Sequence, residues 1–248
     1  MHTLNFWHKL HIYRKEVIVL ALLCSSFLPA RAQLSQEINL PNHDNRRIHY
    51  GAVFGLHSRS YNIRYSEAFV SDPSLNTLHS ITPLKTTGLS AGFIFNFRFA
   101  DNLDVKLNAQ VGIYEYQVQY RYFDGANEIV DTQLQEPVNA EFPMLVKYKS
   151  QRRKNFRMYL VAGINPSIEA SARNKREGVE EILLTKGINL SAEYGFGMDF
   201  YYPYFKFSPE IRFSNGLLNI IDQQNNKYSI GIERMVTNSV TLYFHFAG

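Results

Sequence analysis

Cysteine and tryptophan are almost absent from this chain of 248 residues, which has one of each, Cys24 and Trp7. Both lie within residues 1–32, so the rest of the chain has no thiol. A chain without thiols forms neither disulfides nor thiolate metal sites, which suits an oxidising compartment beyond the inner membrane.

Long hydrophobic runs are also missing. The apolar run at residues 17–23 is far short of the roughly 18 to 20 residues that a membrane-spanning helix needs, which argues against a membrane anchor. Basic residues precede this run and Ala30-Arg31-Ala32 follows it, as in a secretory signal peptide with its cleavage site. We expect residues 1–32 to be a cleaved signal peptide. Cys24 does not suit a lipoprotein site, because Leu23 precedes it where a small residue is needed.

An excess of one charge is missing once this segment is removed. The chain carries 26 Lys and Arg against 22 Asp and Glu, but residues 1–32 hold four of the basic residues and one of the acidic ones. The remainder is therefore nearly neutral, and the basic pI of about 9.0 gives no reason to expect a nucleic-acid partner.

Phenylalanine and tyrosine are abundant, with 18 and 16 residues, and they alternate with polar residues. Between residues 89 and 99 every odd position is apolar, and the even positions are polar or small, Ile94 excepted. Successive side chains of a strand point to opposite faces, so such segments are expected to be strands with one apolar and one polar face. Eight are expected, at residues 48–58, 88–99, 103–113, 138–149, 156–168, 188–200, 205–213 and 239–246.

Short and long connections alternate between these strands. The short ones lie at residues 100–102, 150–155 and 202–203, and the long ones at 61–86, 116–137, 169–186 and 218–238. Bacterial outer-membrane barrels have short periplasmic turns and long extracellular loops. We therefore predict an all-β fold, an antiparallel up-and-down transmembrane β-barrel of about eight strands over residues 48–248, after a polar N-terminal lead-in at 33–47. Pro143, Pro166 and Pro209 lie inside expected strands and predict local bulges, because proline cannot donate to a ladder.

A soluble lipocalin-like barrel is the alternative, and it would bury its apolar face and expose its polar one. Here the polar face holds glycine, serine, asparagine and charged residues, which suits a narrow lumen, and the apolar face holds bulky aromatics, which suits contact with lipid. Aromatic residues near the short turns also predict an interfacial girdle. They are Phe99, Tyr148, Phe156, Tyr201, Tyr202, Tyr204 and Phe205. We expect the cell outer membrane as the location and outer-membrane lipid as a partner.

Ten charged residues share the parity of the polar face and form the candidate site, a structural charge network in the lumen. They are Arg98, Asp104, Lys106, Glu141, Lys147, Glu193, Asp199, Lys206, Glu210 and Arg212. The interior of an eight-stranded barrel is just wide enough for side chains to fill, and an unpaired buried charge is costly, so we expect salt bridges that plug the barrel. Lys106 is the expected partner of Glu141, and Arg157 is also expected to face the lumen. A narrow water-filled route and a proton or ion path are the alternatives.

Catalytic, cofactor and metal sites are not predicted. His57-Ser58 and His79-Ser80 are adjacent pairs, but neighbours on a strand point to opposite faces, so neither pair forms a nucleophile–base contact. No nucleophile-elbow motif, phosphate loop or calcium-loop spacing occurs. No small-molecule substrate is evident.

Several segments together resemble PorT-like outer-membrane barrels. The most specific is EFPMLVKY at residues 141–148, which matches an acidic-x-Pro-x-Leu-x-Lys-Tyr strand. The others, in order, are YLVAG at 159–163, YGFGMDF at 194–200, PEIRFSNGL at 209–217, IERM at 232–235 and YF at 243–244. The resemblance covers nearly the whole chain after residue 32.

This resemblance implies a non-enzymatic accessory or assembly role in the type IX secretion system of Bacteroidetes, which also supports gliding in some species. Other secretion-system proteins would then be the partners, contacted by loops and rims. The alternatives are a small general outer-membrane barrel or pore without a secretion role and, less expected, a lipid-modifying barrel enzyme.

Overall fold

The protein is described here by a computed structural model that covers residues 38–125, 127–170, 183–222 and 228–248. The predicted signal peptide and the start of the predicted lead-in lie outside these residues. No helix in the described part of the chain is long and apolar enough to cross a membrane.

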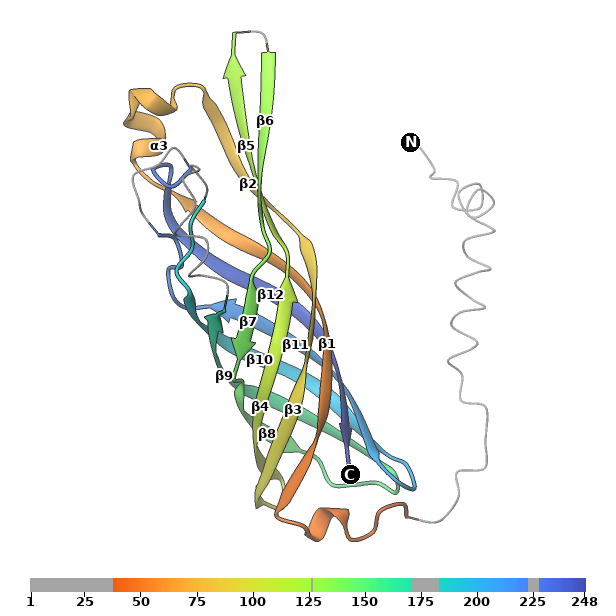
Figure 1. The fold of residues 1–248 in the computed structure, drawn as a ribbon. Coiled ribbons are helices and arrows are strands. Elements are labelled where there is room, and N and C mark those ends of the chain that lie inside the picture. The colour runs from red at the N-terminus through yellow and green to blue at the C-terminus, as the bar shows by residue number, and fades with distance from the viewer. Residues whose placement is uncertain (1–37, 126, 171–182, 223–227) are drawn as a thin grey trace, which may run out of the picture. The chain divides into compact units, whose positions relative to one another are not determined.

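Nine strands close into one antiparallel barrel (Figure 1). They are β1 (Ile48–Tyr65), β3 (Thr86–Ala100), β4 (Leu103–Tyr114), β7 (Val138–Glu141), β8 (Met144–Lys149), β9 (Phe156–Glu169), β10 (Ile188–Tyr201), β11 (Lys206–Gly216) and β12 (Ile232–Ala247). Both β7 and β8 pair with β4 on one side and β9 on the other, so they are two halves of one wall strand. The wall therefore has eight strands in chain order, and β12 pairs with β1 to close it, as predicted.

The barrel is polar inside and apolar outside. On β4, Leu107 is 44% exposed, whereas its neighbour Lys106 is 4% exposed. On β3, Phe93 and Phe95 are exposed and Asn96 is buried. A soluble protein has the opposite arrangement, with apolar side chains inside. Here the apolar outer wall suits contact with lipid hydrocarbon, and the lumen must satisfy the charged groups that face it.

The prolines in the wall do not produce bulges, contrary to the prediction. The register of the wall strand with β4 and with β9 is the same on both sides of Pro143. Pro166 lies opposite Leu190, and Pro209 lies opposite Phe244, each in an unshifted register. Proline removes one donor but accepts an extended backbone, so the strand continues without an extra residue.

Two long connections build a second sheet at one end of the barrel (Figure 1). Its strands are β2 (Leu78–Leu84), β5 (Tyr116–Asp124) and β6 (Asn127–Gln135), in the order β2-β5-β6, and α3 (Ala68–Ser71) and η2 (Pro73–Leu75) precede it. Buried apolar residues from these connections and the barrel rim pack together, among them Leu75, Ile81, Tyr120, Ile221 and Met235. Only loops are predicted here from the sequence, although Tyr116, Val118 and Tyr120 alternate with polar residues as in a strand.

The girdle prediction is wrong for Tyr201. Phe99, Tyr148 and Tyr204 point outward and are more than half exposed, but Tyr201 is 3% exposed. Even positions of β10 face outward, so the odd position of Tyr201 turns it inward. Its ring meets the ring of His43, in the short helix η1 (His43–Asn45), edge to face at 5.7 Å.

The depth of the apolar wall can be tested with Phe95→Arg. We expect this substitution to lower the free energy of unfolding by about 2 to 4 kcal/mol, because arginine would face the middle of the bilayer. Phe99→Arg is the control: it has the same strand, face and chemistry but lies at the rim, where the cost is about 0 to 1 kcal/mol. Urea unfolding in lipid vesicles measures both. Equal losses would contradict the assigned wall.

Candidate functional site

The lumen contains buried ion pairs that join strands of the wall. The Lys147 ammonium on β8 lies 2.9 Å from both carboxylate oxygens of Asp199 on β10, so this pair spans the intervening β9. Lys149 Nζ lies 2.6 Å from Asp104 Oδ1 on the neighbouring β4. All four residues are at most 5% exposed. The charges therefore satisfy one another inside the barrel.

Glu210 on β11 is the centre of the largest cluster. It accepts hydrogen bonds from Lys106 Nζ at 2.8 Å, from the Tyr159 hydroxyl at 3.0 Å and from Arg212 Nε at 2.8 Å. Arg212 Nη1 also lies 2.9 Å from Glu193. Since β4 and β11 are four strands apart in either direction around the barrel, the Lys106–Glu210 pair crosses its full width.

The predicted pair of Glu141 with Lys106 is wrong. Glu141 instead pairs with Arg59 Nη2 at 2.9 Å and accepts a hydrogen bond from Gln110 Nε2 at 2.8 Å. Gln110, not Lys106, is the residue opposite Glu141 in the ladder. Arg59 is absent from the predicted network because the first predicted strand ends at residue 58, whereas β1 continues past it.

Two predicted members of the network have no part in these pairs. Arg98 is half-buried at the end of β3 and pairs with Asp101 in the adjoining turn. Lys206 is 7% exposed and forms no ion pair with any residue that the structure describes. Arg157 faces the lumen at its short-turn end and pairs with Asp44 at 3.0 Å.

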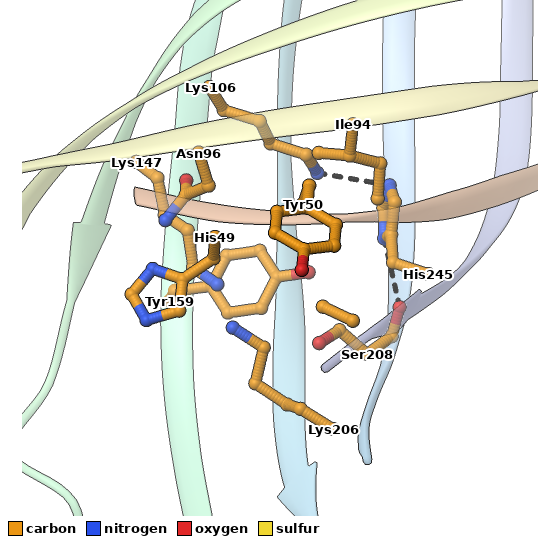
Figure 2. Close-up of a pocket in the computed structure, with 11 residues that line it drawn as sticks. His49, Tyr50, Ile94, Asn96, Lys106, Lys147, Tyr159, Lys206, Ser208 and His245 are labelled. Atoms are coloured by element: carbon orange, nitrogen blue, oxygen red, sulfur yellow. Dashed lines mark hydrogen bonds between the residues drawn. The ribbon is translucent and has the colours of Figure 1, made fainter. Parts of the chain in front are cut away.

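A pocket of about 30 Å³ lies among the lumen charges (Figure 2). Its lining includes three lysines, Lys106, Lys147 and Lys206, and the histidines His49 and His245. This volume holds one or two water-sized molecules and no organic cofactor. Across residues 38–248, apart from the undescribed positions, no group of three metal-ligating side chains occurs.

The tautomer of His245 follows from its contacts. Nδ1 lies 2.9 Å from the backbone oxygen of Ser208, which can only accept, so Nδ1 carries the proton. Nε2 is then an acceptor, and it lies 3.0 Å from Lys106 Nζ. His245 therefore supplies a second acceptor for the Lys106 ammonium.

A serine–histidine contact also lies in the lumen. His57 Nε2 is 2.7 Å from Ser90 Oγ, and Nδ1 is 2.8 Å from Thr241 Oγ1. A catalytic triad would place a carboxylate at Nδ1. The ring of His57 packs edge to face against Tyr114 and Tyr243, and it is 3% exposed. The contact fits a structural hydrogen bond sealed inside the wall.

The residues before β1 cover the short-turn end of the lumen. His43 is buried and stacks on His49 with ring centroids 4.1 Å apart. Asp44 pairs with Arg152 at 3.3 Å and with Arg157 at 3.0 Å. The described part of the predicted lead-in is thus a packed segment rather than a free tail.

The ionisation of this segment fits its packing. Burial and the nearby positive charge of Lys206 lower the pKa of His43 to about 3, so its ring is neutral at pH 7. Burial disfavours the charged form of Asp44, but the attraction of Arg157 and Arg152 outweighs it and holds the pKa of Asp44 below its ordinary value. Asp44 is therefore the charged anchor of the segment.

A double-mutant cycle tests the pair that crosses the lumen. Lys106→Met and Glu210→Gln should each lower the free energy of unfolding by roughly 3 to 5 kcal/mol, because each leaves a buried charge without its partner. The double variant should recover part of the loss. Urea unfolding of the unaltered protein, the two single variants and the double variant measures the coupling energy between Lys106 and Glu210.

The matched control is the cycle of Lys106→Met with Glu141→Gln. Glu141 lies opposite a residue four positions farther along β4, roughly 13 Å at the rise of a strand, so the two losses should add. Additive losses for Lys106 with Glu210 would show that the two side chains do not interact.

Solved structures with a similar chain path include small outer-membrane proteins. OprG of Pseudomonas aeruginosa is 15% identical over 79% of this chain and 94% of its own, with a TM-score of 0.40. Neisserial surface protein A is 8% identical over 79% and 95%, with a TM-score of 0.39. The attachment invasion locus protein Ail of Yersinia pestis is 10% identical over 82% and 100%, with a TM-score of 0.35. At this level of similarity none of them carries information about function.

The sequence itself identifies the family. No curated protein matches the chain significantly. The profile of the family described as "Outer membrane protein beta-barrel domain" matches residues 32–222, which include seven of the eight wall strands described above. The chain belongs to this family and is a small β-barrel protein of the cell outer membrane.

Proposed function

We propose that this protein is a closed, non-enzymatic barrel that acts at the cell surface by binding a partner protein through the sheet β2-β5-β6. The observation that carries the proposal is the free edge of β6, which pairs with β5 alone in the described structure. Long connections are extracellular in barrels of this class, so the edge faces the outside of the cell.

The contents of the lumen support a closed barrel rather than a general pore. Lys106 and Glu210 meet across its full width, and Arg59 reaches Glu141 across three strand intervals. An open aqueous channel needs a larger barrel or a lumen free of such bridges. The pocket next to Lys106, on its short-turn side, has a volume of only about 30 Å³.

The surroundings of His57 support a role without catalysis. Its partners are two hydroxyl groups, and the aromatic rings around it exclude a substrate. A lipid-modifying enzyme would need its nucleophile in contact with an acyl chain, whereas Ser90 points into the lumen and is 6% exposed.

The chemistry of β6 supports a polypeptide as the partner. Its outer edge presents backbone groups that an extended peptide can pair with, as in strand addition. Ile129 and Leu134 are each 53% exposed and Val130 is 47% exposed, so side chains next to that edge offer apolar contact. Exposed apolar residues on a sheet edge mark an interaction site or an aggregation hazard.

A second candidate function is the accessory role in type IX secretion. It is favoured by the segment at residues 141–148, in which Glu141 and Lys147 both form buried ion pairs. The segment that most resembles PorT-like barrels therefore supplies two of the charged residues that pair inside this barrel. In that role, the partner on β6 would be another component of the secretion apparatus.

Photo-crosslinking in intact cells tests the proposal. A photoreactive residue at Ile129 should give a protein adduct of defined mass, because the edge of β6 is occupied by a partner. The same residue at Phe93, which is 67% exposed on the wall, should give lipid adducts only. Mass spectrometry of the adduct then separates the two candidate functions, since a crosslinked component of the secretion apparatus supports the role in type IX secretion. No protein adduct from Ile129, Val130 or Leu134 would contradict both.

A further inference from the structure

The charges inside the barrel do not balance. Among the described residues, five carboxylates are buried there: Asp104, Glu141, Glu193, Asp199 and Glu210. Among the same residues, seven cations are buried there: Arg59, Lys106, Lys147, Lys149, Arg157, Lys206 and Arg212. The lumen therefore needs two further negative charges for neutrality.

One of these negative charges is supplied by the segment before β1. Asp44 is the carboxylate partner of Arg157 at the short-turn end, 3.0 Å away, and it also lies 3.3 Å from Arg152 at the surface of that end. Each of the five buried carboxylates has its own cation: Arg59 with Glu141, Lys106 with Glu210, Lys147 with Asp199, Lys149 with Asp104 and Arg212 with Glu193. Lys206 is the cation left over.

None of the residues that the structure describes pairs with Lys206 at hydrogen-bond distance. The nearby carboxylate of Asp199 already accepts both contacts from Lys147 at 2.9 Å and one from Ser208 Oγ at 2.6 Å. The side chain of Lys206 extends into the pocket instead (Figure 2), and it is 7% exposed. A buried ammonium without a counter-charge is strongly disfavoured.

We propose that the pocket binds one small inorganic anion, a halide such as chloride, as the counter-ion of Lys206. Lys106 and Lys147 also line the pocket, but each is paired with a carboxylate, so the uncompensated charge of Lys206 is what favours a negative occupant. The pocket volume of about 30 Å³ suits a monatomic anion. The anion completes the charge balance of the lumen.

The segment before β1 packs next to the pocket. His49 lines the pocket, and His43 stacks on His49 with ring centroids 4.1 Å apart. Binding of the anion should stabilise the folded barrel by linkage.

Thermal unfolding at constant ionic strength tests the site. With sodium chloride in place of sodium gluconate, whose anion is too large for the pocket, the midpoint should rise by about 5 °C once chloride exceeds its dissociation constant a hundredfold. Lys206→Met should abolish the difference between the salts. Lys186→Met, which removes an exposed lysine, should keep it.

A second measurement needs no variant. Crystals of the unaltered protein grown in sodium bromide should show an anomalous peak beside Lys206 Nζ. Equal midpoints in the two salts, a salt difference that survives in Lys206→Met, or density in the pocket without anomalous signal would each overturn the proposal. The last result would mean that water fills the pocket.

Discussion

Pairing of charges across a narrow lumen is the interaction on which the rest of this structure depends. A wall of eight strands encloses a space that side chains just fill, so inward charges must be satisfied within it or at its ends. Lys106 and Glu210 meet across the full width, and Lys147 and Asp199 meet across one strand. A change of register by one residue would turn these charges toward lipid and the phenylalanines inward, so the network and the apolar wall specify the same register.

Both ends of the barrel depend on that closed interior. At the short-turn end, His43 and Asp44 pack on lumen residues rather than on solvent. At the other end, residues of the long connections form an apolar cluster with residues of the barrel rim. Two of these connections continue into the sheet β2-β5-β6. With the interior filled, the proposed binding surface is the sheet β2-β5-β6, in which β6 pairs with β5 alone among the described residues.

The sequence predicts the wall well and the pairing poorly. Alternation along residues 89–99 settles the outward and inward faces, because the period of a strand is two. Partners depend on which strands lie across the lumen and on how far each strand extends, which is why Arg59 is missed and Glu141 is paired wrongly with Lys106. The same limit applies to Lys206, whose lack of a partner is a property of the assembled interior. The sheet β2-β5-β6 is missed because long connections in barrels are expected to be loops.

Single-channel recording in planar lipid bilayers tests the closed lumen most directly. The account predicts that the purified protein, inserted at a density confirmed by its heat-modifiable migration, gives no discrete conductance steps in concentrated salt. The Lys106→Met and Glu210→Gln double variant, which removes the bridge across the width, should give small steps or leak. Discrete steps from the unaltered protein, of the size that a water-filled pore gives, would contradict the account.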